Sequence, residues 1–149
     1  MDVAAIFLTA FIQVLFERLA SRELLNFFNR DGIDSVMKKW SKMLMKIEAV
    51  IRNAEEKQIT DKNVKQWLDD LQELAYDLDD ILDDFATEEF HCKLMAETED
   101  STNNLQKLIS ASCAEISSIK FNHSMRSKIE DINSRFNTIL QEKNDLNLR

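Results

Sequence analysis

Hydrophobic residues recur along this chain in steps of three and four, the spacing that places them on one face of an α-helix. Three such stripes stand out, and they predict helices over about 34–58, 61–96 and 124–143. Each stripe is wide enough to face the core of a helical bundle. We expect the core to include Trp40, Trp67, Leu71, Leu78 and Ile132.

The first thirty residues have a different pattern. From Met1 to Phe16 only Asp2, Thr9 and Gln13 are polar. Thr9, Gln13 and the next residue after this segment, Glu17, form a narrow polar stripe at a spacing of four. This segment predicts a helix over about 2–29, with Gly32 as its left-handed cap. Sixteen apolar-rich residues would extend about 24 Å, less than the ~30 Å hydrocarbon core of a bilayer. We therefore expect a helix buried in the bundle, one that could be released later.

Together these elements predict one all-α domain over 1–149, a four-helix bundle. Residues 97–123 are rich in serine, threonine and asparagine, and we expect them to form a mobile connection. A long helical hairpin that dimerises to bury the same stripes is the alternative architecture.

Composition supports a helical fold and excludes several functions. The chain has one glycine and no proline, too few for the turns of a β-sandwich or a doubly wound α/β fold. One glycine also excludes a glycine-rich phosphate-binding loop, so we expect no bound nucleotide and no enzyme activity in this chain. The net charge of −8 argues against nucleic acid as a partner.

The acidic residues are concentrated in one segment. Residues 61–100 carry fourteen acidic and three basic side chains, a net charge of −11. Asp77, Asp79, Asp80, Asp83 and Asp84 share the polar face of the predicted helix, where carboxylates three and four positions apart repel one another. A basic surface docked on this face would relieve the repulsion. Lysines 38, 39, 42 and 46 of the preceding helix could supply part of that charge. We expect neutralisation of Asp79, Asp80 and Asp83 to leave the bundle as stable as before, or slightly more stable.

Metal and catalytic sites lack the residues they need. A glycine-free helix cannot wrap six oxygens around a calcium ion. Glu88 and His91 have the spacing of a di-iron ligand pair, but the second pair is missing. The two cysteines and two histidines do not have zinc-site spacing. We therefore predict no catalytic, cofactor-binding or metal-binding residues in the chain.

Two segments carry a resemblance to a known family. Residues 64–71 read VKQWLDDL and residues 74–85 read LAYDLDDILDDF. They resemble the Rx-type coiled-coil domain of plant nucleotide-binding leucine-rich-repeat immune receptors. Residues 79–83, DDILD, stand where that family has its Glu-Asp-Val-Ile-Asp motif. We call these five residues, Asp79, Asp80, Ile81, Leu82 and Asp83, the acidic motif.

The resemblance implies a signalling and interaction domain without enzyme activity. A nucleotide-binding domain with ADP or ATP and a leucine-rich-repeat domain would follow residue 149. The acidic motif would dock on the repeat domain, with Asp77 and Asp84 in support, and Glu17 would be a candidate pore-lining acid. The receptor would be cytoplasmic, reach the plasma membrane on activation, and act in hypersensitive cell death.

Some alternatives stay open from the sequence. The start, MDVAAI, differs from the Met-Ala-Asp-Ala signature of many self-sufficient members, which favours a sensor that signals through a helper receptor. Self-association is another possibility that the resemblance carries. A cytosolic coiled-coil tether unrelated to immunity is the alternative function. A phosphate-binding loop encoded soon after residue 149 would favour the receptor.

Overall fold

The computed structural model describes residues 5–28, 32–98 and 104–149, and side chains within 5–28, 32–94 and 123–149. All of its regular structure is helical over these residues. The helices are α1 (Thr9–Leu19), α2 (Arg22–Phe27), α3 (Ile33–Lys57), α4 (Lys62–Thr98) and α5 (Asn104–Asp145). The prediction of an all-α fold is confirmed.

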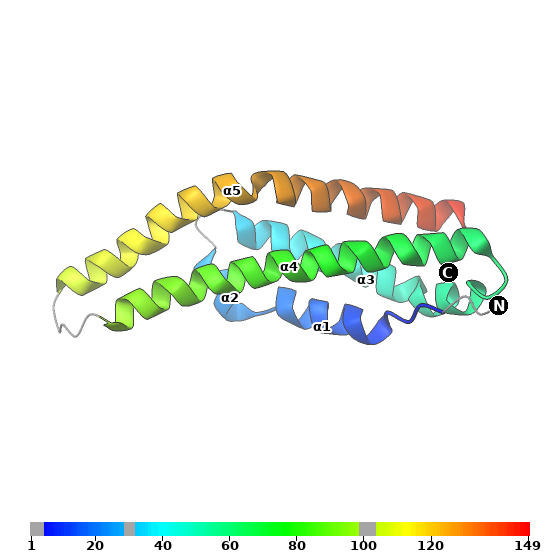
Figure 1. The fold of residues 1–149 in the computed structure, drawn as a ribbon, viewed down its shortest axis with the longest axis horizontal. Helices are drawn as coiled ribbons and strands as arrows, with labels where there is room; N and C mark the ends of the chain where they lie inside the picture. The colour runs from blue at the N-terminus through cyan, green and yellow to red at the C-terminus, as the bar shows by residue number, and fades with distance from the viewer. Residues whose placement is uncertain (1–4, 29–31, 99–103) are drawn as a thin grey trace.

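The helices form a four-helix bundle in which α1 and α2 together make one leg (Figure 1). Both short helices pack on α3 and α4, and α5 packs on α3 and α4. The long helices α4 and α5 run antiparallel and extend beyond the other three at one end (Figure 1). The acidic motif lies on the part of α4 that the other helices surround.

The core contains the residues that the stripes predict. Trp40, Trp67, Leu71, Leu78 and Ile132 are each no more than 3% exposed. Both indole rings also bond to α5: Trp67 Nε1 donates to the carbonyl of Ile139 at 2.9 Å, and Trp40 Nε1 donates to Asn133 Oδ1 at 2.7 Å. These bonds satisfy the polar atom of each buried ring.

Two predicted helices differ from those observed. The expected helix over 2–29 is broken between α1 and α2, because Ser21 is extended and accepts from the backbone N–H of Leu24 as an N-cap. Residues 1–4 and 29–31 lie outside the described residues. Gly32 does adopt a positive φ of 82°, but it precedes α3 instead of ending the first leg.

The connection expected over 97–123 is the larger difference. Helix α4 continues to Thr98 and α5 begins at Asn104, whereas the sequence predicts a start near residue 124. Residues 104–123 contain neither glycine nor proline, so nothing in them forbids a helix. Serine and asparagine lower helix propensity by less than about 0.7 kcal/mol each, which is too little to break a helix.

Candidate functional site

The acidic face of α4 follows from the helical period. Leu78, Ile81, Leu82 and Phe85 point into the core and hold this part of α4 in place. The aspartates between them fall on the sides of the helix that face α1 and α5. Asp61 begins the helix, because its carboxylate accepts from the backbone N–H of Asn63 at 2.9 Å.

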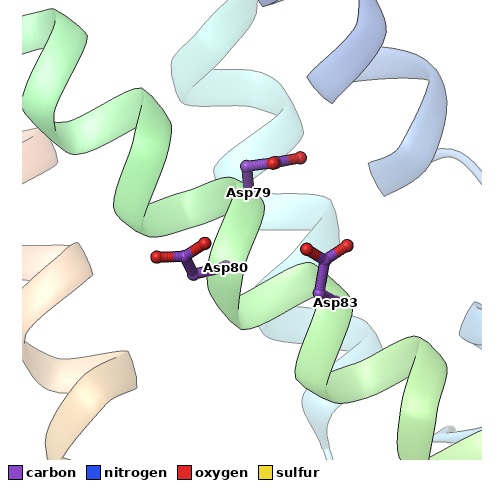
Figure 2. A group of neighbouring side chains, drawn as sticks. All are labelled: Asp79, Asp80 and Asp83. Carbon is purple, nitrogen blue, oxygen red and sulfur yellow. The ribbon is translucent and has the colours of Figure 1, made fainter.

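Asp79 and Asp83 face α1, where Arg18 pairs with both. One guanidinium nitrogen of Arg18 bonds to the Asp79 carboxylate, and the other donates to Asp83 Oδ1 at 2.6 Å. The Arg18 side chain is 26% exposed, against 34% for Asp79 and 63% for Asp83. Figure 2 shows the carboxylates of Asp79 and Asp83 on the same side of α4. Arg18 therefore balances one of the two negative charges on this side of the acidic motif.

The Asp80 side chain leaves α4 towards the other side (Figure 2), although one of its carboxylate oxygens stays within 4.8 Å of those of Asp79 and Asp83. It lines a groove of about 430 Å³ between α4 and α5 and makes no ion pair within the described residues. The acidic groove, as we call it, is lined by Asp77, Asp80, Ile81, Asp84, Ser127, Lys128, Asp131 and Ile132. Four of these side chains are carboxylates and one is a cation. The groove therefore keeps a negative charge that the chain does not balance.

Two cations of α5, Lys128 and Arg135, partly offset the negative charge of the acidic groove. Lys128 Nζ lies 3.4 Å from Asp84 Oδ2. Arg135 pairs with Asp77 and lies 3.4 Å from Asp131 Oδ2. Burial lowers the pKa of Arg135, but hydrogen bonds and charge from Asp77 and Asp131 outweigh it and raise the pKa above its ordinary value. Arg135 is therefore a fixed positive charge.

Asp79, Asp80 and Asp83 could in principle approach a metal ion together. Each offers one carboxylate oxygen, and the three oxygens lie within 4.8 Å of one another. Calcium takes six to eight oxygen ligands in proteins, and three carboxylates on one straight helix supply too few. The guanidinium of Arg18 already bonds to two of them. The arrangement suits a cationic side chain better than a metal ion.

Comparison with known proteins assigns the chain to a family. The profile of the Rx N-terminal domain matches residues 7–123, most of the chain. The chain belongs to the Rx N-terminal domain family.

Similar curated proteins are named as plant disease resistance proteins. An RPP13-like disease resistance protein of Arabidopsis thaliana is 38% identical over 107 residues, which cover 71% of this chain and 10% of that protein. The disease resistance protein RGA1 of Solanum bulbocastanum is 29% identical over 94% of this chain and 13% of its own length. The chain spans about a tenth of the length of these relatives. No solved structure matches it.

The two apolar members of the acidic motif are buried in this Rx N-terminal domain, and Ile81 also lies at the floor of the acidic groove. Ile81 is 2% exposed and Leu82 is fully buried. The motif spans more than one helical turn, so its apolar residues necessarily reach the core while the aspartates do not. Both side chains hold α4 in the bundle, and the role of the acidic motif in docking stays a prediction.

Glu17 lies on the exposed face of α1, one turn beyond Gln13. Its role as a pore-lining acid stays a prediction. Within the described parts of the Rx N-terminal domain, no helix is both long enough and apolar enough to cross a bilayer.

The cations around the acidic motif were missed by reasoning from the sequence. Arg18, Lys128 and Arg135 lie between 44 and 65 positions from the aspartates of α4 they pair with, so no local pattern reveals these pairs. The lysines of α3 that the sequence suggested as partners make no ion pair with α4 in the described structure; Lys38 pairs with Asp34 on its own helix. Asp131 was also missed, because it reaches the groove from α5.

Proposed function

We propose that this domain is the N-terminal signalling and interaction module of a plant immune receptor. It docks on a basic surface of the receptor's own downstream domains, contributes to oligomerisation, and takes part in membrane-associated defence signalling and hypersensitive cell death. It performs no catalysis itself, and ADP or ATP would bind in a downstream nucleotide-binding domain. The family membership supports the receptor, and the unbalanced charge of the acidic groove supports the docking.

The docking surface combines the acidic groove with the exposed side of the acidic motif. Asp80 is its centre, since its carboxylate is exposed and makes no ion pair within the described residues. Ile81 and Ile132 give the groove an apolar floor beneath acidic walls. An arginine or lysine side chain fits such a site, because it has an apolar stem and a cationic end.

The test compares charge removal in the groove with equal charge removal elsewhere. In the receptor that contains this domain, the double variant Asp80→Asn/Asp84→Asn should weaken co-purification with the separately expressed downstream domains and reduce cell death. The control is Glu56→Gln/Asp145→Asn, which removes two exposed charges outside the groove. Equal binding by both double variants at physiological salt would contradict the docking surface.

A further inference from the structure

Arg18 occupies the position that a cation from a partner would take. Its guanidinium spans Asp79 and Asp83, and it also lies 3.4 Å from the backbone carbonyl of Asp79. Arginine fits this task because its planar fork can donate to two carboxylates at once. These two members of the acidic motif thus already have a partner, and it comes from α1.

Helix α1 depends on such contacts for its position. It has only eleven residues, too few to be stable as a helix in water by itself. One side of it is buried through Ile12, Leu15 and Leu19. At its start, the Glu55 carboxylate of α3 accepts from the Leu8 backbone N–H at 2.7 Å. Near its end, Arg18 supplies the ion pairs to α4.

The acidic motif is therefore divided between two tasks. Asp79 and Asp83 pair with Arg18 of α1, whereas Asp80 lines the acidic groove and makes no ion pair with α1 within the described residues. Asp80 is exposed, and a basic partner that binds it breaks no ion pair of the described residues. A second cation brought to Asp79 or Asp83 would instead be repelled by Arg18.

We propose that Arg18 is an internal competitor for the acidic motif, so that a basic partner engages Asp79 and Asp83 only when the end of α1 separates from α4. We call the ion pairs of Arg18 with Asp79 and Asp83, which hold the end of α1 on α4, the clamp. The clamp follows from contacts within the chain. The competition rests on the proposed docking function. Docking at these two aspartates and release of α1 are then one event.

The clamp is tested by amide hydrogen exchange of α1 in the 149-residue chain. Arg18→Met keeps an apolar stem and removes the charge, and Asp79→Asn/Asp83→Asn removes the acceptors' charge. Both variants should exchange α1 amides roughly threefold to tenfold faster, the change expected when ion pairs of this exposure are lost. Arg22→Met and Asp145→Asn are the matched controls, since both residues are exposed and neither makes an ion pair within the described structure.

Further exchange measurements distinguish loss of the clamp from general destabilisation of the domain. Exchange of α5 amides should stay unchanged in Arg18→Met, and Arg18→Lys should restore part of the protection of α1. Added salt should speed α1 exchange in the unmodified chain and have little effect in Arg18→Met, because screening acts on the ion pairs alone. Unchanged α1 exchange in both charge-removal variants would overturn the clamp.

The competition is tested with a short arginine-only peptide as the probe. Arg18→Met should bind it at least threefold more tightly than Arg22→Met, which loses the same charge. That gain should vanish in Arg18→Met/Asp79→Asn/Asp83→Asn. Equal binding by the two arginine variants would overturn the competition. Failure of Asp80→Asn/Asp84→Asn to weaken docking on the downstream domains would instead contradict the proposed function and leave the clamp result standing.

Discussion

Five adjacent residues of α4 have three different environments. Ile81 and Leu82 are buried, Asp79 and Asp83 pair with Arg18, and Asp80 lines the acidic groove. Substitutions within the motif therefore should not act alike. Effects on binding and on folding can be separated only by changing these environments one at a time.

Leu82→Ala should destabilise the domain by about 2–5 kcal/mol, because it leaves a cavity at a fully buried position. Asp80→Asn, two positions away, should change the free energy of unfolding by less than about 0.5 kcal/mol, as expected for an exposed side chain. Chemical denaturation of both variants measures the difference. Equal midpoints would mean that the apolar members of the motif are not structural.

At the scale of elements, the hydrophobic period predicted α3 and α4 to within two residues at each end. The same period gave wrong helix boundaries at two places, the break at Ser21 and the start of α5. Ser21 ends one helix and caps the next, although the apolar residues continue past it. The spacing of hydrophobic residues does not reveal one N-cap residue within such a segment. The start of α5 was missed for the opposite reason, since a polar segment with weak periodicity is still helical there.

The start of α1 relies on a residue of another helix. Leu8 makes no side-chain cap, and Glu55 of α3 accepts from its backbone N–H at 2.7 Å and from Thr9 Oγ1 at 2.8 Å. Glu55→Ala should therefore cost about 1–2 kcal/mol in the free energy of unfolding. Glu56→Ala, at an exposed neighbouring position, should cost much less. Thermal denaturation of the pair provides the comparison, and equal losses would refute the capping role.

At the scale of the whole molecule, the aspartates of the acidic face of α4 pair with cations that lie on other helices, α1 and α5. The aspartates of α4 could be found from the sequence because they recur on one helical face. Their partners on α1 and α5 could not, because which helices are neighbours is decided by packing across more than forty positions. The acidic groove was hidden for the same reason, as α4 supplies three of its acids and α5 the fourth.

The isolated 149-residue chain should hydrolyse no ATP. Nucleotide phosphates are commonly held by a glycine-rich loop before a helix, and the single glycine of this chain, Gly32, cannot form one. Phosphate release by purified protein measures this. ATP turnover that a point substitution within the chain abolishes would contradict it.

The two indole rings give the domain its own optical probe. Trp40 of α3 and Trp67 of α4 are the only tryptophans in the chain, and both are fully buried with their N–H groups bonded to α5. Separation of α5 would expose both rings to water and shift their fluorescence to longer wavelength. Release of the end of α1 would leave the bonds of both rings to α5 in place. The wavelength of tryptophan emission can therefore distinguish separation of α5 from release of the end of α1, without any added label.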